Sequence, residues 1–246
     1  MIGCLCLHGF TGSPYEVEPL VKYLEEHTDW LIVSPTFPGH GTVGRMERVS
    51  FKDWIRTAES ELQALQQKCD TVYLVGFSMG GMIAGYLATS KKIEKLVLLS
   101  AAAYYVSPRQ LLNDIRIMVK DVRKGKLAEN ELFKRYQRKF KLTPFSMTVQ
   151  FRKLVRILKP FLNKITIPTL IVQGECDGVV PKKSAQYIYD TIKSEEKQLV
   201  YLPQSKHIIC HDVEQKDVIR HVYSFLTNTD TDESKGEVVQ HESRST

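Results

Sequence analysis

Short apolar runs alternate with helical patterns along the first 100 residues of the chain. The apolar runs cover residues 2–7, 30–34, 71–75 and 95–99. Between them, residues 15–27, 51–69 and 79–89 carry apolar side chains at helical spacing. Strands that alternate with helices are typical of parallel sheets, because each helix crosses over from one strand to the next. This alternation predicts an α/β fold, with a mainly parallel central sheet flanked by helices.

The alternation stops after residue 101 and resumes at residue 166. The residues between contain three amphipathic helical patterns and no convincing strand. After them, predicted strands at 169–173 and 198–202 alternate with predicted helices at 182–192 and 214–226. We therefore predict a single parallel-sheet core made of residues 1–101 and 166–227, interrupted by a helical cap insertion at 102–165. The three patterns contain Leu111, Ile115, Met118 and Val122, then Leu132, Phe133, Tyr136 and Phe140, and finally Leu154, Val155, Leu158 and Leu162.

The composition places the protein among ordinary globular chains. Hydrophobic residues make up 43% of the 246 residues and charged residues 25%, and no apolar stretch is long enough for a membrane span. The five cysteines are few, scattered and odd in number, which favours reduced thiols over a disulfide framework. Their spacing does not suggest a zinc site. We expect a cytoplasmic protein, with residues 228–246 as a disordered polar tail.

The sequence Gly76-Phe77-Ser78-Met79-Gly80 stands where the third predicted strand gives way to a helix. A side chain at such a sharp turn is lifted clear of the sheet, and the unpaired N–H groups of the next helix point toward it. That geometry suits an oxygen nucleophile whose reaction passes through an oxyanion. The alternative is a glycine-rich turn whose serine only caps a helix. Partners at the right places decide between the two interpretations.

A serine nucleophile needs a base, and the base needs an acid to orient it. Asp177 lies just beyond the strand at 169–173, and His207 lies just beyond the strand at 198–202. Residues that follow different parallel strands converge at the carboxyl edge of the sheet. We predict Ser78 as nucleophile, His207 as base and Asp177 as its orienting acid. Glu175 and His211 remain alternatives for the acid and the base.

Backbone N–H groups are expected to bind the oxyanion. One is the N–H of Met79, which follows the nucleophile, and the other is that of Phe10, in the loop after the first strand. The neighbouring His8 is expected to brace this loop rather than to take part in the chemistry.

The segments "LHGFTGSP", "GHG", "GFSMGG", "GECDGVVP" and "SKHII" occur in this order along the chain. Together they resemble the α/β-hydrolase family, and more narrowly small bacterial carboxylesterases and monoacylglycerol lipases with a helical cap. The resemblance covers residues 1–227. It implies the Ser78, Asp177 and His207 triad, the Phe10 and Met79 oxyanion donors, and no metal or organic cofactor. The oxyanion loop lacks the triple glycine of some lipases, which argues against bulky tertiary-alcohol esters.

The resemblance implies hydrolysis of short- to medium-chain acyl esters or monoacylglycerols through an acyl-enzyme. The alternatives are an acyl thioesterase, a carbon–carbon-bond hydrolase and a non-catalytic binding protein on the same fold.

The charge of the chain is concentrated in the predicted cap. Residues 109–164 contain sixteen Lys/Arg and four Asp/Glu, a net charge of +12, whereas the whole chain carries +6 and the remainder therefore −6. No nucleic-acid-binding motif accompanies these charges. We expect a small ester as substrate, no nucleic-acid partner, and transient contact of the basic cap with an anionic lipid surface.

Overall fold

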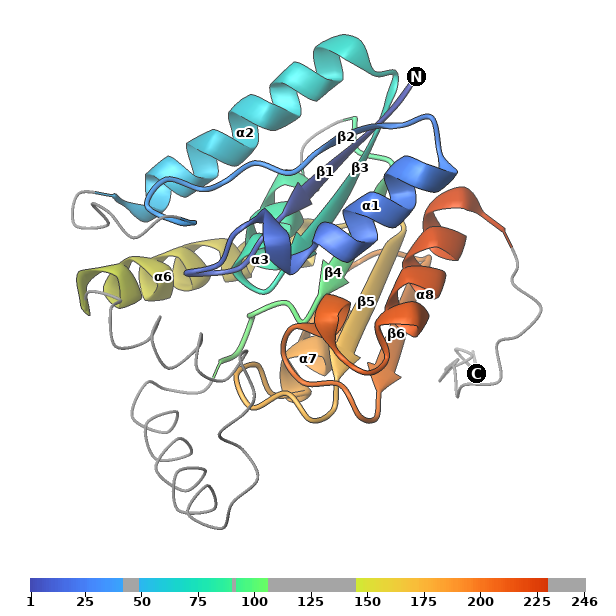
Figure 1. Cartoon of the computed structure of the whole chain (residues 1–246). Helices are drawn as coiled ribbons and strands as arrows, with labels where there is room; N and C mark the ends of the chain where they lie inside the picture. The colour runs from blue at the N-terminus through green and yellow to red at the C-terminus, as the bar shows by residue number, and fades with distance from the viewer. Residues whose placement is uncertain (42–48, 90–91, 106–144, 230–246) are drawn as a thin grey trace, which may run out of the picture.

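The computed structural model describes residues 1–41, 49–89, 92–105 and 145–229. Its centre is a sheet of six parallel strands in the order β2-β1-β3-β4-β5-β6 (Figure 1). The strands are β1 (Ile2–Leu7), β2 (Leu31–Val33), β3 (Thr71–Phe77), β4 (Lys95–Leu99), β5 (Thr169–Gly174) and β6 (Lys197–Leu202). Because every strand runs in the same direction, all their carboxyl ends lie at one edge of the sheet. The predicted α/β architecture with a parallel sheet is confirmed.

Helices cover both faces of this sheet. One face packs against α2 (Phe51–Lys68), α3 (Met79–Leu87), α6 (Phe145–Leu158) and α7 (Lys183–Thr191). On the other face α1 (Glu18–His27) and α8 (Gln215–Thr227) lie side by side, although they are the first and last α-helices of the described residues (Figure 1). Successive side chains of each strand point to opposite faces of the sheet. Leu5 and Leu7 therefore pack in one core, and Cys4 and Cys6 pack in the other.

The first helix begins later than its apolar pattern predicts. A short 3₁₀ turn, η1 (Pro14–Glu16), precedes α1, which starts at Glu18 rather than at residue 15. Pro19 explains the break, because a proline inside a helix loses a backbone hydrogen bond and its ring clashes with the carbonyl four residues earlier. In the first turn of α1 the same proline is tolerated, since no intrahelical partner is needed there.

Strand β3 extends two residues beyond its predicted end. Gly76 and Phe77 pair with Leu98 and Leu99 of β4, so the strand continues to the residue before Ser78. The glycine weakened the strand pattern in the sequence, but the neighbouring strand supplies the pairing that holds it extended.

The third amphipathic pattern of the predicted cap forms α6 and the following 3₁₀ segment η3 (Lys159–Lys164). Leu154, Val155 and Leu158 are buried, and α6 lies against α2 and α3. The first two patterns, at residues 111–122 and 132–140, fall outside the described residues, and so does the tail from residue 230. The division into core, cap and tail stays a prediction.

All five cysteines are free thiols, and four of them are buried while Cys176 is exposed. Within the described ranges, no helix combines the length and apolar character needed to cross a bilayer.

Candidate active site

Ser78 occupies a sharp turn between β3 and α3. Its φ of 54° and ψ of −112° are a strained combination for a residue with a side chain. The glycines on either side are required by contact: a Cβ on Gly76 would lie 2.4 Å from the Gly80 carbonyl oxygen, and a Cβ on Gly80 would lie 2.3 Å from the carbonyl oxygen of Leu7. The turn therefore needs both glycines, and it presents Ser78 at the amino terminus of α3.

The residues predicted as base and acid lie next to this serine. His207 Nε2 is 3.0 Å from the Ser78 hydroxyl oxygen, and His207 Nδ1 is 2.7 Å from Asp177 Oδ2. The Asp177 side chain is fully buried, and only 10% of the His207 side chain is exposed. A continuous chain of hydrogen bonds thus runs from a buried carboxylate through an imidazole to the serine hydroxyl.

The electrostatics of the pair favour an ionised aspartate. Burial would raise the pKa of Asp177, but His207 and the N–H groups of Val179 and Val180, which donate to Oδ1 at 2.8 and 2.9 Å, lower it below its ordinary value. Burial likewise lowers the pKa of His207, whereas Asp177 and, more weakly, Glu16 raise it, and the net direction is upward. The histidine is therefore a stronger base than an ordinary imidazole.

The alternative base and acid lie elsewhere. His211 stacks on the Tyr15 ring with centroids 4.2 Å apart, and its Nε2 is 2.5 Å from the Tyr15 carbonyl oxygen. Glu175 points to the surface and pairs with Lys182 at 3.1 Å. Of the weighed candidates, the structure brings together Ser78, His207 and Asp177.

Several residues that sequence reasoning passed over hold the His207 loop. A Cβ on Gly174 would lie 2.3 Å from the Ser205 carbonyl oxygen, so the glycine allows the His207 loop to approach the Asp177 loop. The Glu214 carboxylate accepts hydrogen bonds from the Ser205 hydroxyl at 2.6 Å and from the Gln204 N–H at 3.0 Å. In the sequence, Gly174 was the one signal of this close approach, because it stands between the predicted strand at 169–173 and Asp177.

Gln173 also supports the acid. Its side-chain amide is fully buried at the end of β5 and donates to Asp177 Oδ2 at 3.1 Å and to the Val180 carbonyl oxygen at 3.2 Å. No sequence pattern singled out this residue, because a lone glutamine in a strand has many structural explanations.

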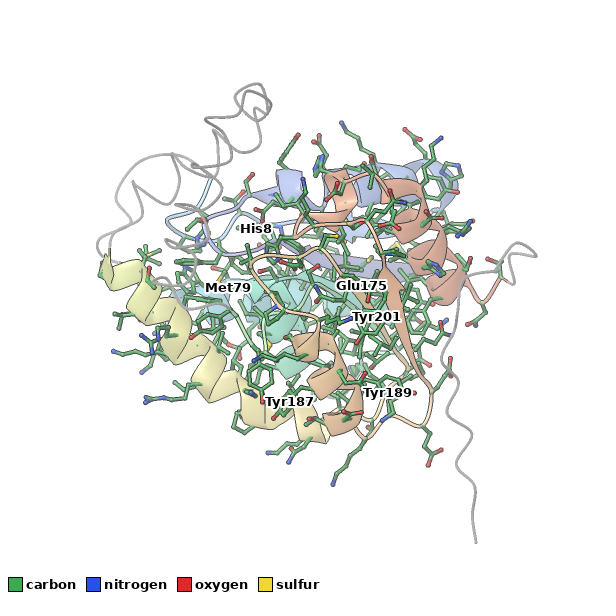
Figure 2. The ribbon with its side chains drawn as sticks, turned by 90° about the horizontal axis from the view of Figure 1, so that it is seen from below. His8, Met79, Glu175, Tyr187, Tyr189 and Tyr201 are labelled. Atoms are coloured by element: carbon green, nitrogen blue, oxygen red, sulfur yellow. The ribbon has the colours of Figure 1, made fainter. Side chains whose placement is uncertain are left out.

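The loop that contains Phe10 lies next to the turn that contains Ser78 and Met79. Gly80 of α3 approaches the carbonyl oxygens of Leu7 and His8, and this contact brings the loop containing Phe10 next to the Ser78 turn. Among the described residues, no group accepts a hydrogen bond from the N–H of Phe10 or Met79. Figure 2 views this end of the sheet and labels His8, Met79 and Glu175, which follow β1, β3 and β5.

His8 braces the loop, as the sequence suggested. Its Nε2 accepts the N–H of Phe37 at 3.1 Å, so the ring proton resides on Nδ1, which donates to the Gly9 carbonyl oxygen at 2.8 Å. His8 is fully buried, and it joins the loop after β1 to the loop after β2.

Aromatic side chains cluster beside the Phe10 loop, which is the segment of residues 8–13 between β1 and η1. The Phe10 ring stacks on Phe151 of α6 with centroids 4.9 Å apart, and it meets Trp54 of α2 edge-on at 5.9 Å. The Tyr105 ring is tilted against the Phe151 ring, and their centroids are also 4.9 Å apart. The cluster joins the candidate site to α6, the described part of the predicted cap.

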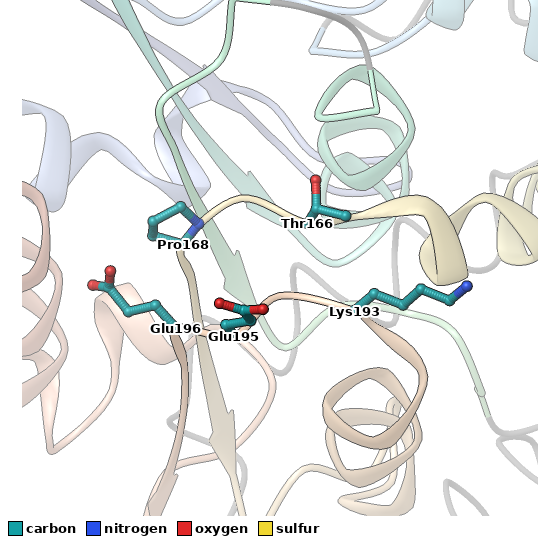
Figure 3. A pocket seen from close by; sticks show the side chains of 5 residues that line it. All are labelled: Thr166, Pro168, Lys193, Glu195 and Glu196. Atoms are coloured by element: carbon teal, nitrogen blue, oxygen red, sulfur yellow. The ribbon is translucent and has the colours of Figure 1, made fainter.

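A separate surface hollow of about 330 Å³ lies far from this chemistry (Figure 3). It is lined by Thr166, Pro168, Lys193, Glu195 and Glu196. These residues precede β5 and β6, so the hollow is at the amino-terminal edge of the sheet, opposite Ser78. Within the part of the chain that the structure describes, no His, Cys, Asp and Glu side chains gather into a group that could hold a metal ion.

Comparison with known proteins identifies the family of this chain. The family model described as serine aminopeptidase, S33, matches residues 3–214. A thermostable monoacylglycerol lipase from Bacillus sp. (strain H-257) is 30% identical over 234 residues, which are 92% of this chain and 90% of the lipase. A carboxylesterase from Bacillus subtilis (strain 168) is 25% identical over 228 residues, or 92% of each chain.

The fold has solved counterparts. A structure reported for the metagenome-derived lipolytic enzymes LipS and LipT matches 93% of this chain and 94% of its own, with a TM-score of 0.74 at 21% identity. That likeness concerns the fold, and the match of the family model over most of the chain supplies the membership. The protein belongs to the serine aminopeptidase S33 family of α/β-hydrolases, within which it is a carboxylesterase- or lipase-like hydrolase.

Proposed function

We propose that the protein hydrolyses short- to medium-chain acyl esters or monoacylglycerols, with Ser78 as nucleophile, His207 as base and Asp177 as orienting acid. The observation that carries this proposal is the hydrogen-bond chain from Asp177 through both nitrogens of His207 to the Ser78 hydroxyl. The names of the relatives, a monoacylglycerol lipase and a carboxylesterase, support the choice of ester class.

In the first half-reaction the Ser78 hydroxyl oxygen attacks the ester carbonyl while His207 Nε2 takes its proton. The carbonyl oxygen becomes an oxyanion, which accepts hydrogen bonds from the N–H groups of Phe10 and Met79. Removing one such donor typically costs about 3–4 kcal/mol of transition-state stabilisation. The carbon–oxygen bond to the alcohol then breaks, and His207 gives its proton to the leaving alkoxide.

In the second half-reaction water replaces the alcohol. His207 takes a proton from the water, whose oxygen attacks the acyl-Ser78 carbonyl, and the same two N–H groups bind the second oxyanion. The bond to Ser78 breaks, His207 returns the proton to the serine, and the carboxylic acid leaves. The ionised Asp177 stabilises the imidazolium in both halves and fixes the proton on Nδ1.

The aromatic cluster of Phe10, Trp54 and Phe151 supports an acyl chain as the group bound beside the oxyanion loop. These rings are apolar surfaces that an alkyl chain can contact favourably. They offer no charged group with which a polar substrate could pair. Residues of the predicted cap outside the described ranges are expected to complete the surroundings of that chain.

The test combines covalent labelling with a substrate panel. A fluorophosphonate is expected to label Ser78, and Ser78→Ala is expected to lose both labelling and turnover, by a factor of about 10⁶ in kcat. The panel compares p-nitrophenyl esters of graded length, monoacylglycerols and acyl-CoAs. Labelling at another serine would contradict the assignment of the nucleophile, and a preference for acyl-CoA would replace the ester by a thioester.

The proposal includes transient contact with anionic lipid surfaces through the basic cap. In the described part of the predicted cap, Arg152, Lys153 and Arg156 are exposed on α6, whose opposite face is buried. No acidic residue occurs from residue 145 to residue 174. Basic residues near an anionic bilayer contribute about 1 kcal/mol each, an attraction that salt screens.

Co-sedimentation with vesicles tests this contact. We expect binding to phosphatidylglycerol vesicles at low salt, weaker binding at high salt, and none to neutral vesicles. Reversing Arg152, Lys153 and Arg156 to glutamate should abolish it. The matched control reverses Lys68, Lys193 and Lys216, which are also exposed but lie outside α6, and should retain most of it. Equal loss in both variants would leave only the net charge of the protein as the cause.

A further inference from the structure

The carboxylate of Glu16 is buried beside the candidate active site, and the reaction described above does not use it. Only 4% of the residue is exposed, and its Oε2 accepts the N–H of Gly9 at 2.9 Å. Glutamate is seldom buried unless its charge is paired or hydrogen-bonded, because desolvating a carboxylate is costly. The position of Glu16 in η1, directly after the Phe10 loop, suggests where its effect is exerted.

The Phe10 loop is folded around this carboxylate. A Cβ on Gly12 would lie 1.9 Å from Glu16 Oε2, and a Cβ on Gly9 would lie 3.1 Å from the same atom. Between the two glycines, Thr11 adopts a φ of 59°, a left-handed conformation that side-chain-bearing residues seldom adopt. The close approach of the carboxylate to both glycines accounts for the path of a loop that is locally strained.

The peptide that joins Gly9 to Phe10 is held from several directions. The Gly9 carbonyl oxygen accepts hydrogen bonds from His8 Nδ1 at 2.8 Å and from the Gly12 N–H at 3.2 Å, while Glu16 holds the Gly9 N–H. In a trans peptide the N–H points opposite to the C=O. Fixing the Gly9 carbonyl therefore fixes the direction of the Phe10 N–H, the proposed oxyanion donor.

From this geometry we propose that Glu16 is a positioning residue, which holds the loop so that the Phe10 N–H faces the oxyanion. This inference rests on the proposed function. Glu16 accepts the N–H of Gly9, the residue before Phe10. His8 donates to the Gly9 carbonyl oxygen, which belongs to the same peptide group as the Phe10 N–H. The proposed role requires a side-chain oxygen at position 16 that accepts the Gly9 N–H, and either a carboxylate or an amide supplies one.

The field of the carboxylate reaches the site as well. Burial lowers the pKa of His207, and Glu16 is one of the groups that raise it. Burial and the Glu16 carboxylate together raise the pKa of Cys210 to about 12.

Two substitutions separate the hydrogen bond from the packing of the side chain. Glu16→Gln keeps a side-chain oxygen that can accept the Gly9 N–H, whereas Glu16→Met has a similar length and no such oxygen. We expect Glu16→Met to lower kcat on p-nitrophenyl butyrate by about 10- to 100-fold, less than the effect of deleting an oxyanion donor outright, with KM changed by less than about threefold. Glu16→Gln should stay within about threefold of the wild type in kcat.

The decisive readout is the inhibition constant of a trifluoromethyl ketone, which adds to the nucleophile and forms an oxyanion. In Glu16→Met this constant should rise by the same factor as kcat falls. The matched control is Glu18→Met, because Glu18 lies two residues on and pairs with Lys22 at the surface, and it should change neither constant. A fall in kcat without a change in the ketone constant would overturn the inference, and so would equal behaviour of Glu16→Met and Glu16→Gln.

If Glu16→Met does not fold, Glu16→Asp decides. This substitution shortens the side chain by one methylene and so withdraws the carboxylate from the Gly9 N–H. We expect kcat and the affinity for the trifluoromethyl ketone to fall together. If kcat and the inhibition constant are both unchanged, the inference is wrong. Failure of the proposed function is seen separately, in the wild type. If the fluorophosphonate does not label Ser78, or if Ser78→Ala remains active, the assignment of the nucleophile fails and this inference fails with it.

Discussion

The hydroxyl oxygen of Ser78 lies 3.0 Å from Nε2 of His207, although 129 positions separate the two residues in the sequence. Ser78 follows β3 and His207 follows β6, and these strands are separated in the sheet by β4 and β5. The loop of residues 203–208, which follows β6, brings His207 to Ser78. Several experiments test what this contact does.

Replacing each of the two neighbouring histidines should give opposite results. His207→Ala should lower kcat by about 10⁴- to 10⁶-fold, because the Ser78 hydroxyl loses the group that takes its proton. His211→Ala should retain most of the activity, since His211 contacts Tyr15 and not Ser78. Steady-state hydrolysis of p-nitrophenyl butyrate measures both. A large loss in His211→Ala, with activity kept in His207→Ala, would reverse the assignment of the base.

A parallel pair tests the acid. Asp177→Asn should fold and yet lower kcat by about 10⁴-fold, because the amide no longer holds the tautomer of His207 in which Nε2 accepts a proton. Glu175→Gln should have almost no effect, since it removes only an exposed ion pair with Lys182. Comparison of kcat for the two folded variants decides between the carboxylates. If Glu175→Gln is the damaging change, Asp177 is not the acid.

The pH dependence of kcat/KM should reflect the raised pKa of His207. The base acts in its neutral form, so activity should be lost as pH falls through the pKa of His207, at a midpoint above the ordinary value of about 6.5. Burial alone would move the midpoint the other way. In Asp177→Asn the carboxylate that raises this pKa is gone, and the acid limb of the residual activity should move to lower pH. A midpoint that does not move would mean that Asp177 does not set the pKa.

Gly174 and Gly178 flank Asp177 and offer a matched test of packing. A Cβ on Gly174 would lie 2.3 Å from the Ser205 carbonyl oxygen and 2.6 Å from that of Lys206. Gly174→Ala should therefore push the His207 loop away, lowering kcat and destabilising the fold by about 1–3 kcal/mol. Gly178→Ala should change neither quantity much, because a Cβ there meets nothing within 4 Å. Urea unfolding and ester hydrolysis measure the two effects, and equal stability of both variants would contradict the close approach of the loops.

Much of the fold is readable in the amino-acid order, because it follows from local patterns. The apolar runs and helical spacings predicted the six strands and their parallel connection, and the glycines around Ser78 predicted a tight turn at the end of β3. Where the prediction of α1 began too early, the cause was also local, since Pro19 interrupts the helical pattern.

The selection among candidate partners of Ser78 required the tertiary structure. His207 and His211 are four residues apart, as are Gln173 and Asp177, and sequence spacing does not tell which side chain turns inward. The answer depends on loops that meet from different strands, where Gly174 admits the Ser205 carbonyl and Glu214 ties down the Ser205 hydroxyl.

Glu16 shows most clearly that sequence alone does not tell which side chain is buried. In the sequence it is one glutamate in a helical pattern that also contains Glu18, and nothing distinguishes the two. In the folded chain Glu18 pairs with Lys22 at the surface, whereas Glu16 is buried against Gly9 and Gly12. Local patterns determine secondary structure through backbone sterics and side-chain periodicity. The environment of a charged side chain is decided only when distant segments pack around it, because burial and hydrogen-bond partners are properties of that packing.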